Sequence, residues 1–371
     1  MTMMNEKLPT YDSILNEAFF RHILPSDVQL TSLFTKKSNS GTAKNQLNKI
    51  LAESPQYTNV ILGMVMYPAL SWSLYGEKIS DVIDLGISSG DAAEFAETKQ
   101  MLHDAFGFDN KLFLANREKY YHLCHKIIDT YDTALQNVAS YPESGVQLQN
   151  VLRLIMDMEP EKGKGVSRFE IIKYLKMAVS AIYQLCGKDM DELIPTLIQF
   201  PITSMLNQDD ENLYVYHNVK VLLREYTRLY WGNPNAADCT SHILRCKSPE
   251  EILKLSERES GLYSADIVLK FLLLIAGAIA LVSYYPVNGG RYNMILRSLV
   301  SNRTITTPDG RSAYVREQEL ARIHNMQPQK FSAMKQEAFA LLGLLLWGYD
   351  GRILMSILTN DKTKVYFLDD C

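Results

Sequence analysis

The chain has 371 residues, of which 47% are hydrophobic and 22% are charged, and its formal net charge is −4. This length and composition allow a large core, so they exclude global disorder and permit two domains or one large domain with two lobes. The 19 glycines and 13 prolines are too few for a many-stranded β protein, and the acidic balance excludes a uniformly basic nucleic-acid coat while allowing a local basic surface.

Helical periodicity dominates the chain. Apolar residues recur three and four positions apart, which places them on one face of a helix. The clearest case begins with a Ser167-x-x-Glu170 capping box and is predicted to end at Gly187. Its predicted apolar face consists of Phe169, Ile172, Leu175, Val179 and Ile182. In chain order, helices are predicted over residues 10–22, 41–53, 59–76, 90–107, 116–142, 167–187, 210–231, 249–257, 266–285, 291–300, 315–324 and 328–358.

Signals for β structure are confined to two short segments. In residues 303–315, β-branched and aromatic residues flank a Pro-Asp-Gly turn, which predicts a small hairpin. Residues 363–371 are compatible with a short terminal strand. We therefore expect an all-α or nearly all-α fold with one small β-hairpin near 303–315.

The polar, glycine-containing stretch "EPEKGKG" at 159–165 is the best candidate for a domain boundary. It predicts an N-terminal helical lobe over 1–160 and a C-terminal helical lobe over 166–371. The alternative is an exposed loop within a single domain.

The segment 267–287 is apolar enough to raise the question of a membrane span. Its uninterrupted apolar part, Phe271 to Val282, is shorter than the roughly 20 residues that cross a bilayer. Lys270 also lies inside any window long enough to span. A helix buried on all sides in a large helical core is therefore favoured, and no membrane partner is expected.

The cysteine pattern indicates a reducing compartment. The start "MTMMNEKLPTYDSI" has no apolar core of the kind that a secretory signal needs. The five cysteines are widely spaced and odd in number, which favours free thiols and a cytoplasmic location. They are Cys124, Cys186, Cys239, Cys246 and Cys371.

The sequence has no recognised motif for catalysis or cofactor binding. The sequence contains no GxxxxGK[ST] loop, dinucleotide fingerprint, GxSxG or HExxH. Cys239, His242 and Cys246 would share one face of a helix, which is a possible set of three metal ligands. No second ligand pair accompanies them, although a fourth ligand could come from His122, Cys124 or His125. Buried thiols beside an ordinary histidine are favoured, so no catalytic residue, cofactor or metal is assigned.

A basic segment is the most informative chemical feature. Between Arg291 and Lys335 the sequence has eight cations and three acidic residues, although the whole chain is acidic. A second basic stripe lies on the helix predicted over 210–231, where Tyr216, Tyr226, Tyr230 and Trp231 are candidates for stacking on bases. The predicted nucleic-acid-binding residues are Lys220, Arg224, Arg228, Arg291, Arg297, Arg303, Arg311, Arg316, Arg322, Lys330 and Lys335.

Residues 319–338 have the outline of a helix-turn-helix. Ala321 is the small residue expected in the first helix, and Asn325 tolerates a left-handed turn. However, the apolar stripe of the second helix continues from Phe331 into the very apolar segment 339–358. We therefore expect this helix to anchor the fold through Phe331, Met334 and Leu341. The residues that it would otherwise offer to a DNA groove are Gln327, Gln329, Lys330, Ser332 and Lys335.

The sequence thus leaves three functional hypotheses. The favoured one is a non-catalytic protein that holds the phosphate backbone of RNA or single-stranded DNA in a basic groove. This layout is analogous to that of viral nucleocapsid proteins, although no stretch matches such a family. One alternative is a helical adaptor that binds protein partners or itself, and the other is a helix-turn-helix DNA-binding regulator using 319–338.

Overall fold

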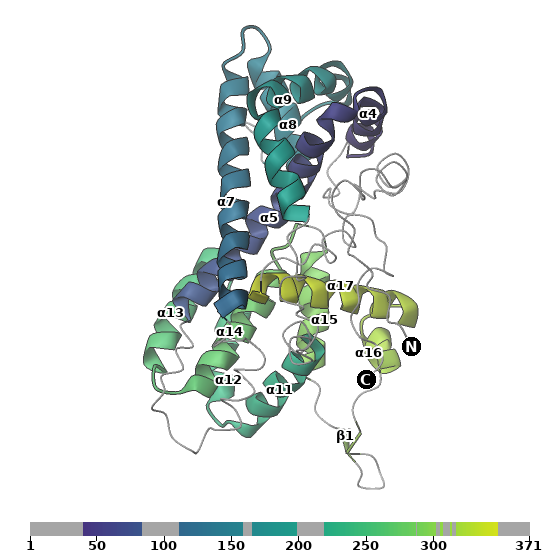
Figure 1. The fold of residues 1–371 in the computed structure, drawn as a ribbon. Coiled ribbons are helices and arrows are strands. Elements are labelled where there is room, and N and C mark those ends of the chain that lie inside the picture. The colour runs from purple at the N-terminus through teal and green to yellow at the C-terminus, as the bar shows by residue number, and fades with distance from the viewer. Residues whose placement is uncertain are drawn as a thin grey trace, which may run out of the picture. The chain divides into compact units, whose positions relative to one another are not determined.

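The computed structural model of the chain describes residues 40–83, 111–158, 165–198, 219–286, 288–301, 305–306, 312–313 and 317–347. These residues are almost entirely helical, which confirms the predicted fold class (Figure 1). The helices predicted over 10–22 and 90–107 and the terminal strand lie outside the described residues.

Contacts between residues divide the chain into two compact units. Unit 1 consists of Met1–Ser71, His122–Ile202 and Tyr349–Val365, and unit 2 of Trp72–Tyr121, Thr203–Gly348 and Tyr366–Cys371. The helices α5 (Thr58–Val82) and α7 (Lys111–Ala139) contribute residues to both. Residues 159–164 lie outside the described part, and the division predicted there stays a prediction.

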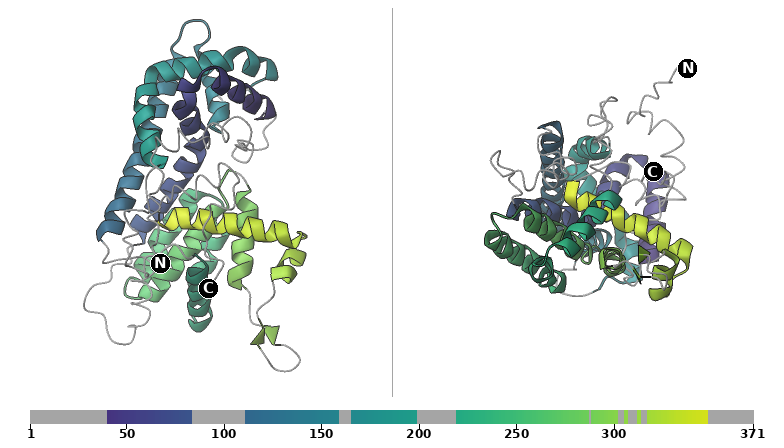
Figure 2. Two further views of the ribbon diagram at one scale, coloured as in Figure 1. Left: turned by 45° about the vertical axis from the view of Figure 1, so that its right-hand side comes forward. Right: turned by 90° about the horizontal axis from the view of Figure 1, so that it is seen from below.

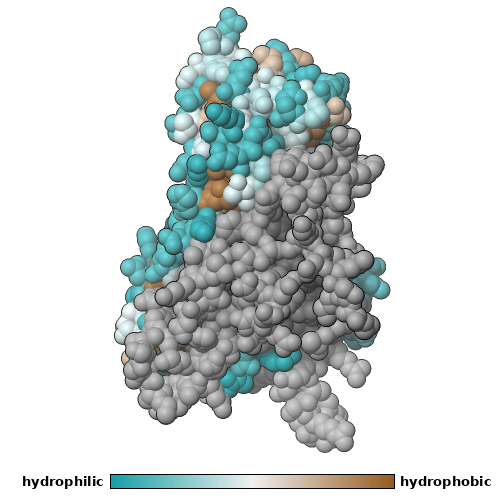
Figure 3. All heavy atoms as spheres, viewed as in Figure 1, coloured by the Kyte–Doolittle hydropathy of each residue, from teal (hydrophilic) through white to brown (hydrophobic). Residues whose placement is uncertain are grey.

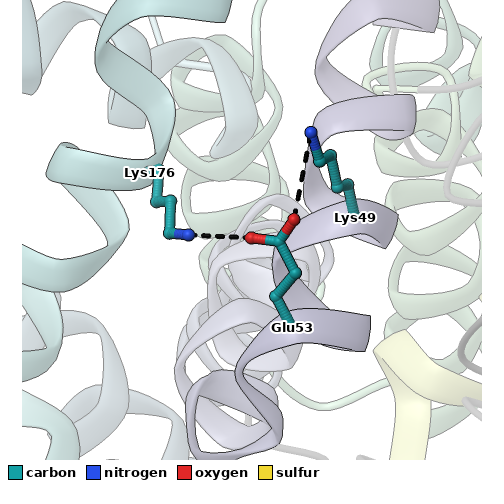
Figure 4. A network of polar contacts seen from close by, with 3 residues as sticks. All are labelled: Lys49, Glu53 and Lys176. Atoms are coloured by element: carbon teal, nitrogen blue, oxygen red, sulfur yellow. Dashed lines mark hydrogen bonds and ion pairs between the residues drawn. The ribbon is translucent and has the colours of Figure 1, made fainter.

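In unit 1, α9 (Arg168–Ile198) packs against α4 (Ser40–Glu53) and α8 (Gly145–Ile155). A single-turn 3-10 helix, η2 (Pro55–Tyr57), joins α4 to α5. On the surface, Lys176 of α9 donates to Glu53 of α4 at 2.7 Å, and Lys49 lies 3.9 Å from the same carboxylate (Figure 4). The hydrogen bond and charge of Lys176 lower the pKa of Glu53. This network links the two helices at an exposed site, where ion pairs contribute little stability.

The core of unit 1 contains a close approach that requires glycine. The Tyr131 hydroxyl donates to the Val60 carbonyl oxygen at 2.8 Å, and its ring is fully buried. An ideal Cβ at Gly63 would overlap that hydroxyl and lie 2.9 Å from Ile194 Cδ1. Only glycine therefore lets α5 accept the ring. The nearby Tyr67 hydroxyl donates to Asp132 at 2.8 Å.

The start of α9 confirms the predicted capping box. The backbone N–H of Ser167 donates to Glu170 Oε2 at 2.7 Å, and the N–H of Glu170 donates to Ser167 Oγ at 3.2 Å. The predicted end at Gly187 is wrong, because α9 continues to Ile198. The turns after Gly187 bury Met190, Leu193, Ile194 and Leu197, and this packing outweighs the cost of about 1 kcal/mol for a glycine inside a helix.

The apolar face predicted for α9 is only partly buried. Leu175, Val179 and Ile182 lie in the core, whereas Phe169 is 70% exposed and Ile172 is 52% exposed. At the start of the helix, Ile171 is the buried residue in place of Phe169 and Ile172. Figure 3 shows a few hydrophobic areas among mainly hydrophilic residues on the face that carries α7, α8 and α9. No helix was predicted for α8, although Leu148, Val151, Leu152 and Ile155 have helical spacing and are buried.

Unit 2 is built around α14 (Ile267–Val282), in which every residue from Phe271 to Val282 is buried. The helix contacts α11 (Val219–Gly232), α12 (Ala236–Ser241), α13 (Pro249–Leu262), α15 (Gly289–Ser301) and α17 (Pro328–Trp347). It therefore forms the predicted core helix. In the described part of the chain, no helix combines the length and hydropathy needed to cross a membrane.

The remaining predicted elements of unit 2 are present. Strand β1 (Ile305–Thr306) pairs antiparallel with β2 (Ser312–Ala313), with Ile305 opposite Ala313, as expected for the hairpin. Helix α16 (Glu317–Ile323) leads into a turn at Asn325, whose φ of 51° is left-handed. The N–H of Met326 donates to the Ala321 carbonyl at 2.8 Å, which closes the end of α16 in the manner of a Schellman motif. The predicted turn is thus confirmed.

The helix expected to place Cys239, His242 and Cys246 on one face is broken. Helix α12 ends at Ser241 and is followed by a short 3-10 helix, η6 (Ile243–Arg245). Cys239 is a buried free thiol, His242 is exposed, and Cys246 is half-buried. Among the residues that the structure describes, no group of three or more His, Cys, Asp and Glu side chains could hold a metal ion.

Candidate nucleic-acid interface

The helices that carry the predicted cations pack against one another in unit 2. Helix α15 contacts α11, α14 and α17, and α17 also contacts α11 and α16. Figures 1 and 2 show α17 lying across α15, with α16 at its start. The structure therefore gathers four cation-bearing helices from a stretch of more than one hundred residues, of which α11, α15 and α17 are net basic and α16 is not. Their predicted binding residues with described side chains are Arg224, Arg228, Arg291, Arg297, Arg322, Lys330 and Lys335.

Six of these seven side chains belong to exposed residues, and Lys335 is half-buried. The exposure follows from amphipathic packing. Helix α11 buries Leu222, Tyr226 and Leu229, which turns its arginines outward. Helix α15 buries Tyr292, Ile295 and Leu296, with the same effect. We call the exposed set the basic surface, and it consists of Arg224, Arg228, Arg291, Arg297, Arg322 and Lys330.

The remaining predicted binding residues are not placed. Lys220 belongs to α11, but its side chain lies outside the described part of the structure. Arg303, Arg311 and Arg316 flank the strands of the hairpin and also lie outside the described residues.

The charge balance of these helices is positive. Together α11, α15, α16 and α17 contain eight lysines and arginines against four glutamates, and α15 has no acidic residue. Glu225 accepts an ion pair from Arg228 Nε at 2.7 Å, and Glu337 accepts a 2.6 Å hydrogen bond from the Tyr292 hydroxyl. These contacts do not change the balance of the four helices, which is eight positive against four negative charges, a net excess of four positive charges.

The neighbouring helix α13 shows the opposite balance. It contains four glutamates against Lys254 and Arg258, and Arg258 pairs with Glu259 at 3.2 Å. Cations therefore outnumber acidic residues on α11, α15 and α17 but not on α13 or α16.

The predicted stacking aromatics differ in exposure. Tyr226 is buried, so it is unavailable to a ligand, and burial raises the pKa of its hydroxyl. Tyr230 is half-buried, while Trp231 is 45% exposed. Tyr216 lies outside the described residues. Of the three aromatics described, Trp231 is thus the most exposed.

The proposed recognition helix serves the core along most of its length. Phe331, Met334 and Leu341 are buried, as the sequence predicted. Gln327, Gln329 and Lys330 are exposed at its start, whereas Ser332 and Lys335 are half-buried. Of the residues that a recognition helix would offer to a DNA groove, only those at the first turn of α17 are therefore exposed.

One contact beside the basic surface was not predicted. The His324 ring stacks on Phe331 with centroids 5.9 Å apart, and its Nε2 lies 2.5 Å from Ser298 Oγ. Ser298 is 26 residues from His324 in sequence, so no local pattern predicts this contact.

No protein-family model, curated protein or solved structure matches the chain.

Proposed function

We propose that this protein binds RNA or single-stranded DNA through the basic surface, without catalysis. The observation that carries the proposal is the set of six exposed cations on four helices that pack together. Five of the six are arginines, whose planar guanidinium groups donate paired hydrogen bonds to phosphate oxygens. Because every strand has the same backbone, such a surface binds with little sequence preference.

A titration of a fluorescently labelled single strand of about 12 nucleotides tests the proposal. We expect binding at low salt that weakens steeply as salt rises, because phosphate contacts release counterions. The double variant Arg291→Glu with Arg297→Glu should weaken binding by about tenfold or more, since it reverses two charges on α15.

The matched control reverses two exposed cations elsewhere in unit 2, Arg245→Glu on η6 and Lys254→Glu on α13. It makes the same change in net charge, so it should have a much smaller effect. Equal losses in the two double variants would mean that net charge alone governs binding. Absence of binding by the unaltered protein at low salt would exclude the function.

A second candidate function is protein interaction, and the exposed apolar residues of α9 favour it. Phe169 and Ile172 lie one turn apart and are largely exposed beside Lys173 and Lys176. Exposed aromatic and aliphatic side chains of this kind are typical of contact surfaces. Light scattering of the unaltered chain and of Phe169→Asp tests self-association. A mass independent of concentration and of the substitution would count against it.

A further inference from the structure

The exposed face of α11 carries an ordered row of three side chains. Arg224, Arg228 and Trp231 are four and three residues apart, so they share one face of the helix. The Arg228 side chain is 57% exposed and Trp231 is 45% exposed. This row combines two phosphate-binding groups with a large flat ring at one end of the helix.

The ring of Trp231 is supported from the core. Tyr226 is buried in unit 2, and the Tyr230 ring stacks on it with centroids 6.0 Å apart at 22°. Trp231 meets Tyr230 edge to face, with centroids 5.2 Å apart at 88°. The three rings form a ladder from the interior to the surface, and the edge-to-face contact favours one orientation of the indole. An indole held in this way loses little conformational freedom when a ligand binds.

The arginines of the row keep donors for a ligand. Arg228 uses Nε for its pair with Glu225. An arginine has five N–H donors, so the two terminal nitrogens of the guanidinium group remain for a phosphate. Arg224 is exposed one turn away. Along the helix axis, Arg224 and Trp231 are about 10 Å apart, so a strand that runs along this face of α11 can contact both residues.

We infer that Trp231 stacks on an unpaired base of the same strand whose phosphates Arg224 and Arg228 bind. This inference rests on the proposed function. It makes Trp231 the residue that gives the site its preference for strands with accessible bases. In a duplex the faces of internal bases are covered by their neighbours, so the indole selects single strands. Helix α15 offers no equivalent, because the exposed side chain between Arg291 and Arg297 is Met294, which has no ring.

The test compares three labelled oligonucleotides of equal length: a single strand with bases, the same strand made abasic, and a duplex. The unaltered protein should bind the base-containing strand about 5- to 100-fold more tightly than the abasic one. Trp231→Ala should remove that difference and leave affinity for the abasic strand unchanged. Trp231→Phe keeps a ring and should retain most of the preference. Arg224→Ala should weaken both single strands alike.

The outcomes separate this inference from the proposed function. If Trp231→Ala binds the base-containing strand as tightly as the unaltered protein, Trp231 does not stack, although the basic surface still binds. If the substitution weakens both single strands equally, its role is structural and the inference is wrong. A tighter complex with the duplex than with the base-containing strand also overturns it. Failure of the unaltered protein to bind any of the three overturns both proposals.

Discussion

His324 Nε2 lies 2.5 Å from Ser298 Oγ, so the corner between α16 and α17 is hydrogen-bonded to α15. The Ser298 hydroxyl donates to the Met294 carbonyl at 2.7 Å, which leaves the N–H of His324 as the donor in this pair. Arg297 precedes Ser298, and Arg322 lies two residues before His324. The contact therefore fixes the helices of two cations of the basic surface against each other.

Removing this contact should loosen the corner. His324→Ala removes the hydrogen bond and the stacking on Phe331, and we expect it to lower the free energy of unfolding by about 1–2 kcal/mol. Urea denaturation measures the change. Ser298→Ala and the double variant complete a double-mutant cycle, in which the losses should be less than additive by about 0.5 kcal/mol or more. Additive losses would show that the two side chains do not interact.

The salt dependence of binding should report the number of phosphate contacts. If all six cations of the basic surface contact phosphates, the slope of log affinity against log salt should be about −4 for a single strand. Arg291→Ala with Arg297→Ala should reduce the magnitude of this slope by about 1.4, because binding through two fewer phosphate contacts releases fewer counterions. The slope is measured by titrations at several salt concentrations. An unchanged slope in the double variant would remove α15 from the interface.

The start of α9 should lose stability in acid through its capping box. The hydrogen bonds from Ser167 lower the pKa of Glu170, so the carboxylate stabilises the folded state above its ordinary pKa of 4.5. That contribution is lost as pH falls below 4.5 and through the lowered pKa of the folded state. Urea unfolding of the unaltered protein and of Glu170→Gln at pH 7 and pH 3 measures it. Glutamine still caps a helix but does not titrate, so the difference between the two proteins should shrink at pH 3. A constant difference would contradict the assignment.

The capping hydroxyl can be tested separately. Ser167→Ala should lower the free energy of unfolding by about 1 kcal/mol at pH 7, because the N–H of Glu170 loses its acceptor. Ser167→Thr is the matched control, because threonine keeps a hydroxyl that can accept from the same N–H. It should cost much less than alanine. A loss with threonine as large as that with alanine would contradict the capping role of the hydroxyl.

The close packing at Gly63 should not tolerate a methyl group. Gly63→Ala would place its Cβ on the Tyr131 hydroxyl and should destabilise the protein by about 1–3 kcal/mol, because the ring or α5 must shift. The matched control is Gly41→Ala in α4, where nothing lies within 4 Å of an added Cβ. That change should be neutral or slightly stabilising, since alanine favours a helix. Thermal unfolding of both variants provides the comparison, and equal effects would contradict the packing argument.

Periodicity and local chemistry determined much of this molecule. The run from Phe271 to Val282 identified a core helix, because a helix apolar on all sides must be covered on all sides. Ser167 and Glu170 identified the start of α9, and Asn325 identified a left-handed turn, since these depend on neighbours in sequence. The excess of arginine between residues 291 and 335 was likewise visible from the chain alone.

Tertiary packing decided what local rules could not. Gly187 does not end α9, because the core beyond it buries the following turns. Phe169 and Ile172 have the spacing of core residues but remain exposed, since burial depends on which neighbouring helix is present and spacing records only a shared face. The same reason separates Tyr226 from Trp231: both fit a base-stacking pattern, but only packing against the rest of unit 2 determines which ring reaches the surface.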